Sequence, residues 1–99
     1  MVRHIVLFQL KKELPENEKR TAMTQFKNGI EALPAVISCI RHIEVGFNLN
    51  EDEQWDICLN GDFDSLDDVR LYSTHPEHLK VSGALKPYLA GRSCVDYAF

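Results

Sequence analysis

Residues 2–10, with the sequence VRHIVLFQL, decide the fold because they form a strand that is apolar on both faces. Successive side chains of a strand point to opposite faces, so Val6 and Phe8 share one side. Ile5 and Leu7 share the other side. A strand with one wet face would instead alternate apolar with polar residues. We therefore predict a central strand that is buried on two sides.

A helix is expected between Pro15 and Pro34, because proline suits the first turn of a helix and cannot continue one. Its apolar positions recur at spacings of three and four: Met23, Phe26, Ile30 and Leu33. Two alternating strands follow, within 38–49 and 54–63, and a last one covers 93–99. The strand within 54–63 is expected to place four apolar side chains on one face: Trp55, Ile57, Leu59 and Phe63.

A second helical region, with a break in it, is expected from Ser65 to Gly91. Ser65 is followed three residues later by Asp68, a spacing that resembles a capping box. Pro76 suits the first turn of a further helix, and His75 then occupies its N-cap position. The helix is therefore predicted to break near 73–75.

The order strand, helix, strand, strand, helix, strand predicts one α+β domain over residues 1–99 with a ferredoxin-like fold. Right-handed crossovers place both helices on the same face of a four-stranded antiparallel sheet, which leaves the other face bare. An exposed apolar sheet face usually marks an interface. We expect a homodimer in which two protomers pack sheet against sheet.

Composition and charge exclude several classes of partner. The net charge is −4 and the basic residues are scattered, which argues against nucleic acid and against an anionic membrane surface. No stretch approaches the ~18 apolar residues of a membrane span. Three cysteines without paired spacing, Cys39, Cys58 and Cys94, predict buried thiols in a reducing, cytoplasmic compartment.

Four motifs resemble the stress-responsive A/B barrel (Dabb) family: VRHIVLFQLKKE at 2–13, LPAV at 33–36, YSTHPEHLKV at 72–81 and VDY at 95–97. The resemblance covers essentially the full chain and implies a dimeric α+β barrel. Within the family, some plant members look like stress-stable oligomers and some are polyketide cyclases that need no metal or redox cofactor. Most bacterial members have no assigned reaction, so the family name does not specify an activity.

The resemblance to the cyclases implies a cavity between sheet and helices with His4, Tyr72 and His78 as catalytic residues. A histidine can take and return a proton near neutral pH, and a positioned tyrosine can orient or donate. We expect no cofactor and a small organic ligand in contact with four further residues: Val6, Phe8, Trp55 and His75. The cyclases carry another tyrosine on the first helix where this chain has TQFKNG, so their substrate class does not transfer.

Other interpretations of the same residues stay open. His75 and His78 are neighbours on a helix surface and could instead be metal ligands. Zinc-binding helices usually place their two histidines four residues apart, whereas these are three apart, so we expect no metal. The HPEH segment is also compatible with a plain helix start, and a lone strand histidine such as His4 is often structural. A non-enzymatic stress-associated oligomer and a monooxygenase-like or haem-handling barrel are the alternative functions.

Overall fold

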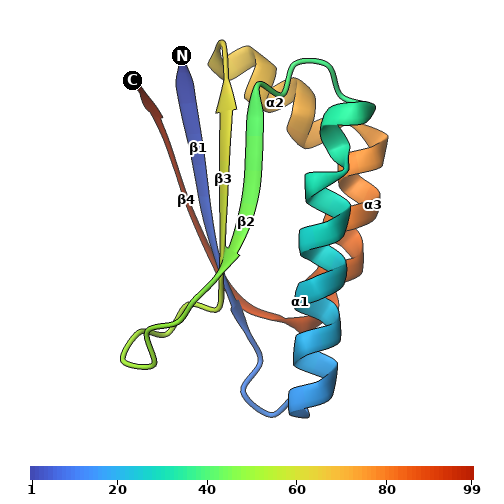
Figure 1. Cartoon of the computed structure of the whole chain (residues 1–99), viewed down its shortest axis with the longest axis vertical. Coiled ribbons are helices and arrows are strands. Elements are labelled where there is room, and N and C mark those ends of the chain that lie inside the picture. Colours follow the sequence, from blue (N-terminus) through green and yellow to red (C-terminus); the bar gives the residue numbers. More distant parts are fainter.

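The computed structural model describes residues 1–99 and places one four-stranded antiparallel sheet against a layer of helices (Figure 1). Its elements are β1 (Val2–Leu10), α1 (Glu16–Glu31), η1 (Leu33–Ala35), β2 (His42–Phe47), β3 (Ile57–Phe63), α2 (Leu66–Thr74), α3 (Pro76–Leu85), η2 (Lys86–Tyr88) and β4 (Leu89–Ala98). The predicted ferredoxin-like order is confirmed, with the second helix divided into α2 and α3. No helix is long and apolar enough to cross a membrane.

The strands are arranged in the order β2-β3-β1-β4, so β1 is an inner strand and β4 lies at an edge. Residues paired directly across an antiparallel ladder point to the same face of the sheet. His4 is opposite Gly61 on β3 and opposite Asp96 on β4. Val6 is opposite Cys94. This register carries alternate β4 side chains to the face that the helices cover.

The core lies between the sheet and the helices, and only one face of β1 is fully buried. Val6, Phe8 and Leu10 on the helix side are at most 8% exposed. Ile5 and Leu7 on the other side are half-buried. All helices lie on one face of the sheet (Figure 1), so full burial of β1 on its other face depends on the expected partner protomer and stays a prediction.

Local side-chain capping explains where α2 and α3 begin. The N–H of Asp68 donates to Ser65 Oγ at 3.2 Å at the start of α2. His75 ends α2 and begins α3, where its Nδ1 accepts the N–H of Glu77 at 3.1 Å. Pro76 is the first residue of α3. The predicted break and the predicted capping role of His75 are both present.

Trp55 does not continue the alternation of β3, because that strand begins two residues later, at Ile57. The Asp56 carboxylate accepts the N–H of Leu10 at 2.7 Å, while the Asp56 N–H donates to the carbonyl of Phe8 at 2.8 Å. These contacts divert the chain ahead of β3. Trp55 lies instead in a pocket shared with Leu7 and Cys58.

Candidate functional site

A cavity of about 510 Å³ lies between the sheet and the helices, and it brings the three predicted catalytic residues together. His4 comes from β1, Tyr72 from α2 and His78 from α3. The ring centroids of His4 and Tyr72 are 6.0 Å apart, and those of Tyr72 and His78 are 4.5 Å apart. The wall also contains Val6, Phe8, Phe26, Leu59, Ser73, Leu79, Ser82, Gly83, Leu85, Lys86, Leu89 and Arg92.

His4 is held in one orientation by a carboxylate. Its Nδ1 lies 2.5 Å from Asp96 Oδ1, and the residue is only 5% exposed. Since an ionised carboxylate can only accept, Nδ1 carries the hydrogen of a neutral His4 and Nε2 carries the lone pair. A carboxylate–imidazole pair of this kind leaves Nε2 as the basic nitrogen.

Tyr72 is fully buried, and its hydroxyl has no hydrogen-bond partner in the protein. A buried hydroxyl without a partner costs about 1–3 kcal/mol. Burial also strongly raises the pKa of Tyr72, an effect that the nearby positive charge of Arg92 only partly offsets. The phenol therefore stays protonated and is free to donate to a group that enters the cavity.

His78 is also fixed through its Nδ1, which lies 2.9 Å from the carbonyl oxygen of Ser73 and donates to it. Burial lowers the pKa of His78 below its usual value of 6.5, against the opposing effect of that hydrogen bond. His78 is therefore neutral at pH 7, with the lone pair on Nε2. Two imidazoles and one phenol thus border the same cavity, with His78 neutral and Tyr72 protonated at pH 7.

Not all residues expected to bind a ligand are in this cavity. Val6 and Phe8 line it, as expected. His75 is absent from the wall, since its Nδ1 is used to cap α3. Trp55 belongs to a separate pocket. The expectation that these last two line the cavity is corrected by this placement.

Sequence reasoning missed the contribution of β4. Arg92 lines the cavity, Asp96 pairs with His4, and the Sγ atom of Cys94 lies 3.6 Å from His4 Nδ1. Alternation alone predicts that these three share one face of β4. It does not say which residue of β1 they face, because the register is decided by pairing between the two ends of the chain.

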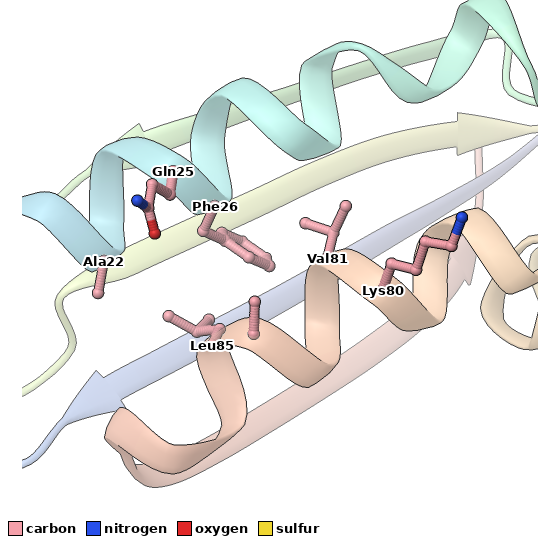
Figure 2. A pocket seen from close by; sticks show the side chains of 7 residues that line it. Ala22, Gln25, Phe26, Lys80, Val81 and Leu85 are labelled. Atoms are coloured by element: carbon pink, nitrogen blue, oxygen red, sulfur yellow. The ribbon is translucent and has the colours of Figure 1, made fainter.

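A second hollow lies between α1 and α3 (Figure 2) and has a different character. It has a volume of about 230 Å³ and is lined mainly by apolar side chains, among them Phe26 and Leu85. Its cation, Lys80, is already paired with Glu77 at 3.1 Å. The helices approach closely at Gly29, where a Cβ atom would lie 2.9 Å from Val81 Cγ1. We therefore assign this hollow to helix packing.

The sheet, its one-sided helix layer and the cavity between them define a ferredoxin-like α+β protein with a histidine-bearing internal site. The chain belongs to the Stress responsive A/B Barrel Domain family, Dabb, whose sequence model matches residues 2–99. A comparison with curated protein sequences finds no match.

Solved structures with the same fold include proteins described as dimeric. One from Bacteroides fragilis, of unknown function, is 53% identical with a TM-score of 0.97, over 99% of this chain and 95% of that one. One from Thermobifida fusca, also of unknown function, is 27% identical with a TM-score of 0.79, over 99% and 90%. A hydroxynitrile lyase from Passiflora edulis is 17% identical with a TM-score of 0.74, over 99% and 92%, and shares the fold alone.

Proposed function

We propose that this protein is a homodimer that binds a small organic molecule in the cavity and performs acid/base chemistry on it. The proposal is carried by the Tyr72 hydroxyl, which is buried without a protein partner beside two histidines. An unsatisfied buried donor is costly, so its presence in a cavity suits a ligand acceptor. His4, Tyr72 and His78 are the proposed catalytic residues.

The chemistry that best suits these groups is proton abstraction next to a carbonyl. Nε2 of His78, which is neutral at pH 7, takes the proton, and the Tyr72 hydroxyl donates to the carbonyl oxygen as negative charge develops there. The protonated Nε2 of His78 then returns a proton to the product, and Nε2 of His4, whose lone pair is free because Asp96 holds Nδ1, accepts a hydrogen bond from the bound molecule and orients it.

Deuterium exchange tests this reaction directly. Small ketones and aromatic carbonyl compounds are incubated with the protein in D₂O, and incorporation next to the carbonyl is followed by NMR. We expect exchange above the buffer rate that falls about 10²-fold or more in His78→Gln and Tyr72→Phe, because general acid or base catalysis is worth that much. His42→Gln is the matched control, since His42 lies on β2 and is exposed.

Exchange in His78→Gln and Tyr72→Phe equal to the wild type would refute the assignment of these residues. Thermal shifts with the same compounds separate binding from chemistry, because a bound ligand raises the melting temperature whether or not it reacts. The His4→Gln, His78→Gln double variant is tested in the same way. A compound that raises its melting temperature as much as that of the wild type binds outside the cavity.

We propose that the dimer forms through the bare sheet face. Val95 and Tyr97 on this face of β4 are 53% and 43% exposed, and half-buried Ile5 and Leu7 lie beside them on β1. Apolar surface of this kind usually marks an interface. The same surface supports the alternative function, a stress-associated oligomer without catalysis. An interface-only role predicts no exchange activity together with a melting temperature that rises with protein concentration.

A further inference from the structure

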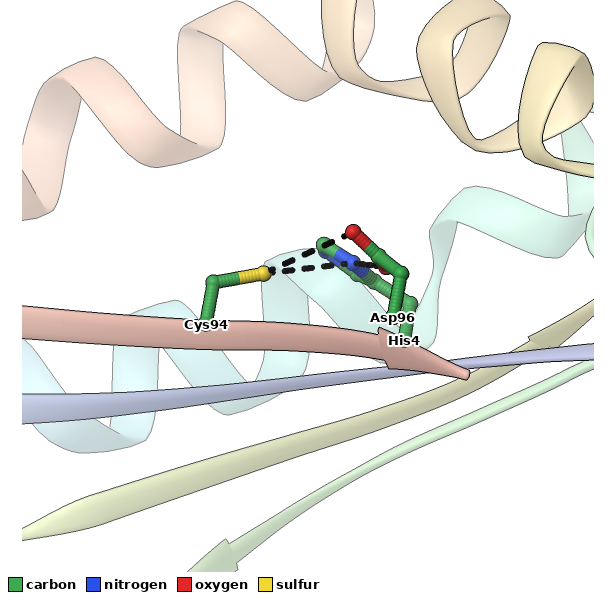
Figure 3. A group of neighbouring side chains, drawn as sticks. All are labelled: His4, Cys94 and Asp96. Carbon is green, nitrogen blue, oxygen red and sulfur yellow. Dashed lines mark hydrogen bonds and ion pairs between the residues drawn. The ribbon is translucent and has the colours of Figure 1, made fainter. Parts of the chain in front are cut away.

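Three side chains with different donor atoms converge beside the cavity (Figure 3). Ligand atoms of His4, Cys94 and Asp96 all lie within 4.8 Å of one another. Cys94 Sγ is 3.6 Å from His4 Nδ1 and 3.9 Å from Asp96 Oδ2. Imidazole nitrogen, thiolate sulfur and carboxylate oxygen are the donors that zinc prefers in proteins.

The strand register, rather than chance contact of flexible side chains, creates this cluster. His4 is paired with Asp96, and Cys94 is paired with Val6, two residues further along β1. All three side chains therefore point to the helix side of the sheet, as Figure 3 shows. His4 is 5% exposed and cannot swing away without disturbing the core.

The distances fit a tetrahedral zinc ion with one adjustment. Metal–ligand bonds of roughly 2.0–2.3 Å place neighbouring donor atoms about 3.3–3.6 Å apart. The two sulfur distances are already near this range. The separation of 2.5 Å between His4 Nδ1 and Asp96 Oδ1 must widen by roughly 0.8 Å. Asp96 can make this shift, because it lies on an edge strand with its side chain 29% exposed.

We propose that His4, Cys94 and Asp96 form a binding site for Zn²⁺ or a similar borderline divalent ion. The ion takes the place of the hydrogen that His4 and Asp96 share and of the thiol hydrogen of Cys94, both of which are released to solvent, and three protein ligands leave one position for water or a small ligand. This site goes beyond the proposed function and does not depend on it, since metal binding is measured without any substrate.

Cobalt is the probe, because Co²⁺ occupies zinc sites and a cobalt–thiolate bond gives a near-ultraviolet charge-transfer band. The full chain, freed of metal with a chelator, is titrated with Co²⁺, and Zn²⁺ is then added against a chromophoric chelator. We expect one ion per chain and a thiolate band that Zn²⁺ abolishes. Cys94→Ser removes the band and weakens Zn²⁺ binding by about tenfold or more, and Asp96→Asn weakens it similarly.

Cys39→Ser and Cys58→Ser are the matched controls, since both thiols lie outside the cluster, and they keep the band and the affinity. A wild-type protein that binds no stoichiometric ion overturns the proposal, as does a band of equal strength in Cys94→Ser. The wild-type titration decides the matter even if a variant folds poorly. The deuterium-exchange assay on metal-free protein reports separately on the proposed function.

Discussion

Replacing Tyr72 by phenylalanine separates stability from function at the centre of the cavity. The tyrosine ring packs against Phe63, with centroids 5.1 Å apart, and against His78 at 4.5 Å. Phenylalanine keeps this packing and removes only the hydroxyl. Because that hydroxyl is buried without a protein partner, its removal costs no hydrogen bond within the chain. The substitution should therefore stabilise the protein while it damages the proposed chemistry.

The magnitude follows from the cost of an unpaired buried hydroxyl, about 1–3 kcal/mol. Part of this cost is already relieved if water reaches the cavity, so we expect a gain of about 1 kcal/mol in the free energy of unfolding. For a domain of this size, 1 kcal/mol corresponds to roughly 4–8 °C in melting temperature. Urea denaturation at fixed protein concentration gives the free energy, and calorimetry gives the melting temperature.

Tyr88→Phe is the control, because Tyr88 packs at the edge of the core and its hydroxyl is not among the buried unpaired groups. Its stability should stay close to that of the wild type. A loss of 1 kcal/mol or more in Tyr72→Phe, with Tyr88→Phe unchanged, would show that the Tyr72 hydroxyl is already satisfied. The observation that carries the proposed function would then be removed.

Three further results are expected. Burial lowers the pKa of His78, so on acidification the unfolded chain takes up this proton before the folded chain does. The contribution of His78 to the free energy of unfolding is therefore complete above pH 6.5, the usual pKa, and is lost as the pH falls towards the pKa of the folded state. Urea midpoints measured at pH 5.5 and 7.5 should differ less in His78→Gln than in the wild type. Ile30→Ala, at a fully buried site of α1, should lose about 2–5 kcal/mol in urea denaturation, whereas Val36→Ala, at 57% exposed, should stay within roughly 0.5 kcal/mol. Val95→Asp should halve the mass measured by light scattering, and Leu71→Asp, on exposed α2 surface, should not.

The local features of the chain were predictable because short-range chemistry decides them. Apolar spacing located α1, and the step from His75 to Pro76 located the break between α2 and α3. The alternation along β3 was also predictable as far as Ile57. It failed at Trp55, because hydrogen bonds between Asp56 and β1 end the regular strand there, and no local pattern records such a contact.

Part of the candidate site was likewise predictable from the sequence, and part was not. The sequence by itself determined the order of elements and the helix-capping role of His75. Its family motifs also pointed to the three proposed catalytic residues, His4, Tyr72 and His78. Only the tertiary structure decided that Asp96 and Cys94 join His4. The physical reason is that β1 and β4 come from opposite ends of the chain, and their register depends on the packing of the whole sheet rather than on either strand alone.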